Sequence, residues 1–184
     1  MQKREVLFDM RKLQRQATYL TIGLMFVASF IYLIIHGFEI SISLSALAIF
    51  FLLIIIGIIL HELLHGIGFI VIGKVKSSQI KYGFSWKDGA AYAHCMVPIK
   101  VRAYRVALLL PVFLTGLLPL LISYIIGNGV LLTASVILTA GGIGDWLIFR
   151  SLTKYEASQF VKDHPTKVGY FIYTDSAKES EKTT

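Results

Sequence analysis

Four long apolar stretches, residues 19–35, 42–72, 104–126 and 130–152, dominate this 184-residue sequence. A helix needs roughly 20 apolar residues to cross a bilayer, and in lipid only helices and closed barrels satisfy their own backbone polar groups. The stretches therefore predict an all-α membrane protein with four transmembrane helices. A mean hydropathy of +0.70 and a charged fraction of only 16% agree with this class.

The distribution of basic residues predicts the topology. All 18 Lys and Arg residues lie in three blocks, which are residues 3–15, 74–105 and 150–182. The two short linkers, residues 37–41 and 127–129, contain none. The positive-inside rule therefore places both termini and the long middle loop in the cytoplasm. We interpret the net charge of +7 as this topology signal, with membrane lipid as the partner and no nucleic acid.

The middle loop, residues 74–102, contains two segments rich in aromatic and β-branched residues, Gln79–Ser85 and Ala90–Pro98. The dipeptide Asp88-Gly89 lies between them and is typical of a hairpin turn. The loop therefore predicts a cytoplasmic β-hairpin between spans two and three.

We expect residues 1–152 to form one four-span domain and residues 153–184 to form a cytoplasmic tail. Within the tail, Val168–Thr174 has the composition of a short strand, and the polar segment Ser176–Thr184 is expected to be disordered.

The second apolar stretch contains the motif His61-Glu62-Leu63-Leu64-His65. Residues four apart lie on one face of a helix, so His61 and His65 can both bind one metal ion, and Glu62 lies beside them as a general base. Three ionisable groups are costly in an otherwise apolar span, and metal binding compensates for that cost. The alternative is an ordinary helix end at the membrane surface, but the apolar residues that follow, 67–73, favour the metal site.

A protease zinc site uses three protein ligands and one open position, so a third ligand is needed. Asp145, in Gly141-Gly142-Ile143-Gly144-Asp145-Trp146, is the best candidate. At 1.5 Å per residue, His65 lies about 13 Å before Lys74 and Asp145 about 8 Å before Arg150, at comparable depths. The three glycines would allow close helix packing. The alternative is that Asp145 is a snorkelling carboxylate near the helix end, paired with Arg150.

His94 lies on the second arm of the predicted hairpin, and the sequence is compatible with several roles for it. It could contact the substrate or the transition state, or serve as a further ligand together with Cys95. A single loop histidine is more often an exposed polar residue.

The segments HELLHG at residues 61–66, AYAHCMVP at 91–98 and GGIGDW at 141–146 resemble the zincin peptidases found among small bacterial membrane proteins, a family long described as a domain of unknown function. The layout is similar to that of site-2 intramembrane metalloproteases. The resemblance implies a multi-pass protein of the bacterial cell membrane. It also implies Zn²⁺ bound by His61, His65 and Asp145, and Glu62 as the general base.

The leading hypothesis is a zinc-dependent, membrane-embedded endopeptidase that cleaves a membrane protein or a peptide. The second is a metal-binding membrane protein without hydrolytic activity, such as a pseudoprotease or a regulatory factor. The third is a small transporter or channel, because buried ionisable groups also mark ion paths. Two histidines and a carboxylate suit other first-row ions too, with iron the main alternative to zinc.

Overall fold

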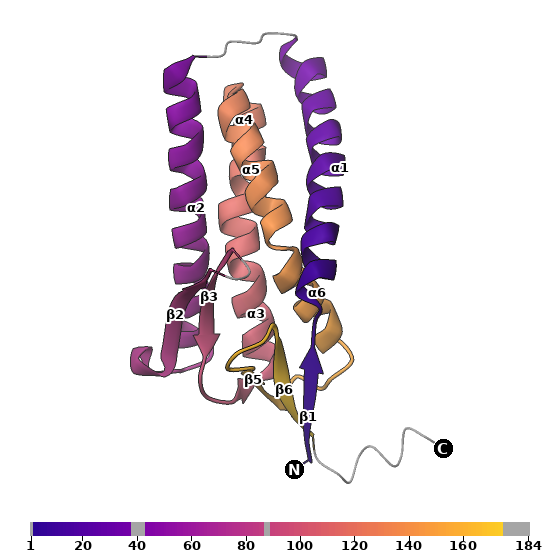
Figure 1. Ribbon diagram of the computed structural model, residues 1–184, viewed down its shortest axis with the longest axis vertical. Coiled ribbons are helices and arrows are strands. Elements are labelled where there is room, and N and C mark those ends of the chain that lie inside the picture. The colour runs from indigo at the N-terminus through magenta and orange to yellow at the C-terminus, as the bar shows by residue number, and fades with distance from the viewer. Residues whose placement is uncertain (1, 38–42, 87–88, 175–184) are drawn as a thin grey trace, which may run out of the picture.

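The computed structural model describes residues 2–37, 43–86 and 89–174 (Figure 1). The protein is mostly helical, with long helices side by side and its strands gathered at one end (Figure 1). Within the described residues the chain also contains six strands. The prediction of a mostly helical membrane protein is therefore confirmed. The description "all-α" is incomplete, because the described residues also form two small sheets.

Four helical segments are long and apolar enough to cross a membrane. They consist of α1 (Met10–His36), α2 (Leu44–Val71), α3 (Val101–Pro111) continued by the π-helical turn η2 (Val112–Leu117) and α4 (Leu118–Ile126), and α5 (Gly129–Gly141) followed by α6 (Ile143–Leu152). These segments match the four predicted spans. The first begins earlier than hydropathy indicated because the Asp9 side chain caps α1, accepting hydrogen bonds from the backbone N–H groups of Arg11 and Lys12.

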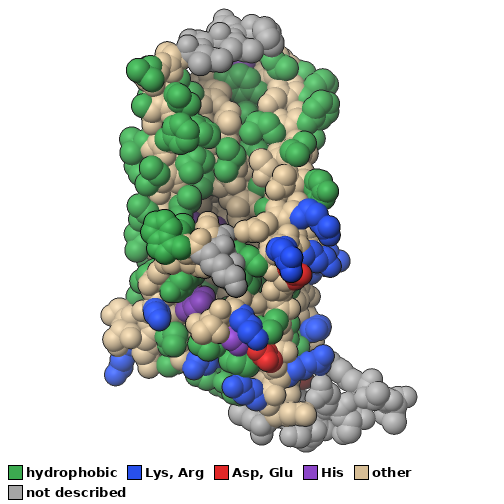
Figure 2. Space-filling view, viewed as in Figure 1, with side chains coloured by type: hydrophobic (Ala, Val, Ile, Leu, Met, Phe, Trp, Pro, Cys, Tyr) green, Lys and Arg blue, Asp and Glu red, His purple; other side chains and the backbone are tan. Residues whose placement is uncertain are grey.

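Helix α5 packs against both α1 and α2, and α2 also packs along α3. The outer faces of α1 and α2 expose large apolar side chains, and green surface covers much of their length in Figure 2. Phe26 and Leu44, for example, are 75% and 85% exposed. Because soluble monomers rarely expose apolar patches of this extent, the bundle surface fits lipid, and the chain is a multi-pass membrane protein.

The predicted hairpin is present as β2 (Ile80–Ser85) and β3 (Ala90–Cys95), preceded by a 3-10 turn, η1 (Ser77–Gln79). The strands pair antiparallel, with Ile80 opposite Cys95 and Ser85 opposite Ala90. Residues 87 and 88 of the predicted turn lie outside the described residues. Tyr82 places its hydroxyl against the backbone of Gly66, where a larger residue would collide with it. The hairpin therefore contacts α2 immediately after His65.

A second, four-stranded antiparallel sheet has the order β1-β6-β5-β4. It consists of β1 (Gln2–Leu7), β6 (Gly169–Thr174), β5 (Phe160–Asp163) and β4 (Ile99–Lys100). Only β6 was predicted from the sequence. The sheet joins the N-terminus to the segment after residue 152, while the domain division at that residue stays a prediction. The segment Ser176–Thr184, expected to be disordered, lies outside the described residues.

The main buried cluster holds this sheet against the bundle. Val161 and Ile172 of the sheet pack with Phe69 of α2 and Tyr104 of α3, and all four side chains are almost fully buried. Exposed Lys and Arg side chains gather at this end of the molecule and are sparse along the apolar bundle (Figure 2). The cluster fixes both sheets at the end of the helices where His65 and Asp145 lie.

Candidate metal centre

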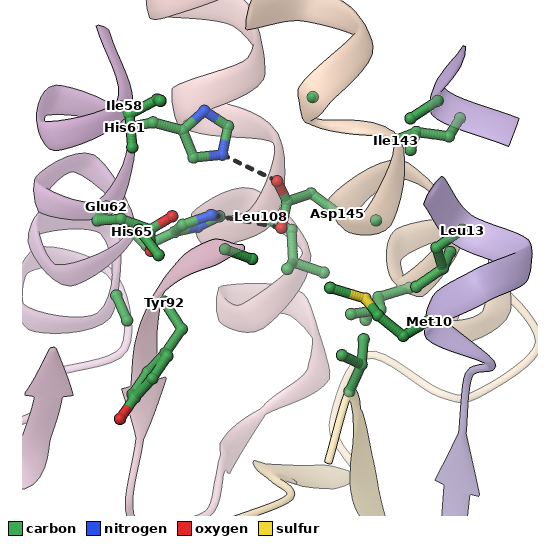
Figure 3. Close-up of a pocket in the computed structure, with 18 of the residues that line it drawn as sticks. Met10, Leu13, Ile58, His61, Glu62, His65, Tyr92, Leu108, Ile143 and Asp145 are labelled. Atoms are coloured by element: carbon green, nitrogen blue, oxygen red, sulfur yellow. Dashed lines mark hydrogen bonds and ion pairs between the residues drawn. The ribbon is translucent and has the colours of Figure 1, made fainter. Parts of the chain in front are cut away.

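His61 and His65 lie one turn apart on α2 and point to the same side of the helix (Figure 3). Their ring centroids are 4.9 Å apart. The His65 ring is buried, with Phe69 stacked below it, and the His61 ring is half-buried. The four-residue spacing therefore brings both imidazoles to one point inside the bundle, as the sequence predicted.

Asp145 extends toward the two histidines from the first turn of α6 (Figure 3). Its Oδ2 lies 3.0 Å from His61 Nε2, and its Oδ1 lies 3.3 Å from His65 Nε2. The helix breaks at Gly142, and a Cβ there would lie 2.7 Å from Val112 Cγ2. Of the three glycines expected to allow close packing, Gly142 therefore does so. A Cβ at Gly141 or Gly144 would meet no neighbouring atom within 4 Å.

The donor atoms fit a zinc ion. Among the residues that the structure describes, His61, His65 and Asp145 are the group that offers three ligand atoms within 4.8 Å of one another. His65 Nδ1 lies 2.9 Å from the Ala107 carbonyl oxygen, which can only accept a hydrogen bond. Nδ1 therefore carries a hydrogen, and Nε2 is the ring nitrogen that faces Asp145. Two imidazole nitrogens and one carboxylate oxygen that converge in this way are a ligand set that zinc prefers.

Glu62 follows His61 on α2 and lies beside His65 in Figure 3. It is half-buried and lines the same cavity as the two histidines and Asp145, yet it is outside the group of converging donors. Glu62 is thus placed as a neighbour of the metal position and not as a ligand.

The cavity in front of these residues has a volume of about 460 Å³. It is bounded by α1, α2, α5, α6 and the strand β3, with Leu13, Ile58, Ala91, Ala93 and Leu138 among its lining residues. Figure 2 shows the surface hollowed between α1 and α2, just above the basic end of the molecule. The cavity is therefore large enough to bring a peptide segment next to the two histidines.

His94 borders this cavity but is not part of the converging group. Its ring stacks on Tyr92 with the centroids 4.5 Å apart, and Figure 3 shows Tyr92 pointing away from the histidine pair. Burial, together with the charges of Lys81 and His164, lowers the pKa of His94. Contact between His94 and a substrate remains a prediction.

One buried carboxylate at the cavity was not recognised from the sequence. Asp163 of β5 accepts hydrogen bonds from the Tyr104 hydroxyl and from the Cys95 backbone N–H, the latter at 2.6 Å. Burial raises the pKa of Asp163 to about 6. Nothing in the local sequence distinguishes Asp163 from an exposed strand residue, because its partners come from the hairpin and from α3.

The fold and these residues together define a membrane protein with a two-histidine, one-carboxylate metal centre. A family model described as "Putative zincin peptidase" matches residues 54–160, more than half of the chain, and the chain belongs to that family. The family implies a metallopeptidase and zinc as its metal. Searches of curated proteins and of solved structures gave no match. The similarity to site-2 proteases stays a prediction.

Proposed function

We propose that the protein is a zinc-dependent, membrane-embedded endopeptidase. The observation that carries this proposal is the convergence of His61, His65 and Asp145 beside Glu62, all facing a cavity of about 460 Å³. A purely structural cluster would not require a second carboxylate at an open cavity. Membership of the zincin family supports the same conclusion.

Each residue of the proposed site has a distinct role. The Nε2 atoms of His61 and His65 and the carboxylate of Asp145 would hold zinc, which when bound supplies the Lewis acidity that lets a water lose its proton near neutral pH. Glu62 takes the proton from the attacking water and later returns it to the leaving amine. The apolar cavity walls limit access of other water.

The edge of β3 is the proposed binding surface for the substrate. Along a strand, successive N–H groups point to opposite edges. The N–H of Met96 points toward β2 and donates to the carbonyl oxygen of Gln79. The N–H of Cys95 points away from β2 and donates to the carboxylate of Asp163. By this alternation, Ala91 and Ala93 also direct their backbone groups away from β2, on the side of the cavity that both residues line.

An extended peptide could therefore pair with Ala91 and Ala93, where short side chains leave room. Asp163 already occupies the N–H of Cys95, so the added strand would end before that residue. The proposed substrate is a membrane-protein segment or a peptide that becomes extended near the membrane surface.

The proposed location is the bacterial cell membrane, with both termini and the hairpin in the cytoplasm. The described N-terminal strand, the hairpin and β6 lie at the same end of the bundle, where the basic side chains gather (Figures 1 and 2). The positive-inside rule supports assigning that end to the cytoplasm.

The test combines metal analysis with proteolysis in detergent. Wild type, Glu62→Gln, His61→Ala and Asp145→Ala are assayed for bound zinc and for cleavage of casein and of a single-span membrane peptide. We expect Glu62→Gln to keep its zinc and lose cleavage, and the two ligand variants to lose both. Equal cleavage by wild type and Glu62→Gln would contradict the proposal, and loss of zinc only in His61→Ala would remove Asp145 from the ligands.

A further inference from the structure

Both histidines of the metal centre contact the third span through the ring nitrogen that faces away from Asp145. His65 Nδ1 lies 2.9 Å from the carbonyl oxygen of Ala107 on α3. His61 Nδ1 lies 3.3 Å from Thr115 Oγ1 on η2. One short segment, residues 107–115, therefore supplies an oxygen to each imidazole.

Pro111 explains why the carbonyl of Ala107 is available. In a continuous α-helix, the N–H of residue 111 would donate to the carbonyl of residue 107. Proline has no N–H, so Ala107 lacks this helical partner. The next N–H along the chain, that of Val112, donates to Leu109. His65 Nδ1, from the neighbouring helix α2, lies within hydrogen-bond distance of this carbonyl oxygen instead.

Thr115 presents an acceptor to His61 for a second reason. Its hydroxyl donates to the carbonyl of Pro111, with an oxygen–oxygen distance of 2.8 Å. Since the hydroxyl hydrogen is committed there, Thr115 Oγ1 faces His61 with its lone pairs, and Nδ1 of His61 must donate. Thr115 lies on the π-helical turn, whose extra residue rotates the following side chains by about 100° relative to an α-helix.

We propose that Pro111 and Thr115 are positioning residues that hold both imidazoles with the hydrogen on Nδ1 and the lone pair of Nε2 directed at the metal. This inference rests on the proposed function, because it assumes that the Nε2 atoms bind zinc. Partners of this kind fix the ring orientation and the tautomer of a ligating histidine, and their loss typically lowers metal affinity about 10- to 100-fold. Neither residue belongs to the group of converging donors or to the residues that line the cavity.

The test is the zinc dissociation constant in detergent, measured by competition with a chromophoric chelator. Thr115→Val removes the hydroxyl and keeps the shape, and we expect its dissociation constant to rise about 10-fold or more. Thr115→Ser restores the acceptor and should stay within about threefold of wild type. Thr133→Val is the matched control, because Thr133 makes the same 2.8 Å hydrogen bond to the carbonyl four residues before it, on α5. It should bind zinc as wild type does.

Pro111→Ala separates positioning from a purely structural role. Alanine favours a helix and restores the N–H that competes for the carbonyl of Ala107. If Pro111 acts only as a helix breaker, the Pro111→Ala variant should be at least as thermally stable as wild type and should bind zinc with the same affinity. The positioning role predicts a zinc dissociation constant raised about 10-fold without loss of helical content in the metal-free protein.

Three results would overturn the inference alone while wild type binds zinc. The first is a zinc affinity within threefold of wild type in both Thr115→Val and Pro111→Ala. The second is an equal loss of zinc affinity in Thr115→Ser and Thr115→Val. The third is a loss of helical content in metal-free Thr115→Val. Wild-type protein that binds no zinc would instead overturn the proposed function, and this inference with it. The visible spectrum of the cobalt-substituted protein gives an independent readout, which should change in Thr115→Val and not in Thr133→Val.

Discussion

Gly68 on α2 lies against Ala107 on α3 so closely that a Cβ at position 68 would be 2.8 Å from both the Cα and the Cβ of Ala107. This approach is what brings the carbonyl of Ala107 within hydrogen-bond distance of His65, three residues earlier on α2. The absence of one side chain thus decides the spacing of the two helices beside the metal centre.

Replacing Gly68 by alanine should therefore separate α2 from α3. The contact is with backbone and Cβ atoms that cannot rotate away, so we expect a loss of about 1–3 kcal/mol of stability from overpacking. Thermal unfolding in detergent measures this loss, and the zinc affinity should fall with it. Gly23→Ala on α1 is the control, because nothing lies within 4 Å of a Cβ there. Equal thermal unfolding midpoints for Gly68→Ala and wild type would show that stability does not depend on this close contact.

Removal of zinc should destabilise the wild-type protein. A ligand that binds only the folded state stabilises it by about 2.7 kcal/mol when present at 100 times its dissociation constant. Addition of a chelator should lower the unfolding midpoint of wild type and leave that of a His61→Ala, His65→Ala double variant unchanged. A wild-type midpoint that does not respond to either zinc or chelator would contradict the metal centre.

Asp163 should make the stability of the metal-free protein depend on pH. Burial raises its folded-state pKa to about 6 from an ordinary value of 3.8, so the folded state binds the proton more tightly than the unfolded state. The resulting stabilisation is fully present below about pH 4 and is lost as the pH rises through 6, with a total on the order of 3 kcal/mol.

The variant Asp163→Asn should lack this decrease between pH 4 and 6. Thermal unfolding midpoints across that range, measured with a chelator present, compare the two proteins. Parallel pH profiles would mean that another group causes the dependence.

Cys95 should react slowly with alkylating reagents. Its side chain is fully buried, its thiol lies 3.3 Å from the carbonyl of Val97, and burial raises its pKa to about 11. At pH 8 this leaves a thiolate fraction at least about 100-fold below that of an ordinary cysteine. Iodoacetamide labelling followed by mass spectrometry measures the rate. The control is Trp86→Cys in a Cys95→Ser background, because Trp86 is 90% exposed. Equal labelling rates would indicate that the hairpin opens readily.

Features that depend on local pattern were predictable from the sequence. The apolar stretches located the four spans, since length and hydropathy suffice for a membrane helix. The aromatic and β-branched segments around Asp88-Gly89 located the hairpin. The spacing of His61 and His65 placed both rings on one face, and Asp145 was correctly expected to lie near them.

Features that depend on contacts between distant segments were not predictable in this way. The strand β1 carries three charged residues in six, so its pairing with β6 has no apolar alternation to reveal it. Thr115 resembles any polar residue in an apolar span, and its contact with His61 depends on the π-helical turn. The buried position of Asp163 likewise arises only when β5, β3 and α3 meet.

The sequence alone determined that this chain inserts four helices in lipid and that one of them presents two imidazoles and a glutamate on adjacent faces. Helical periodicity and the cost of burying charge in lipid are properties of a single segment, so no fold was needed to derive them. The tertiary structure decided how closely Asp145 approaches the histidines and which oxygens orient their rings. Those choices depend on how closely α2, α3 and α6 pack, and that distance is set by contacts between residues far apart in the chain.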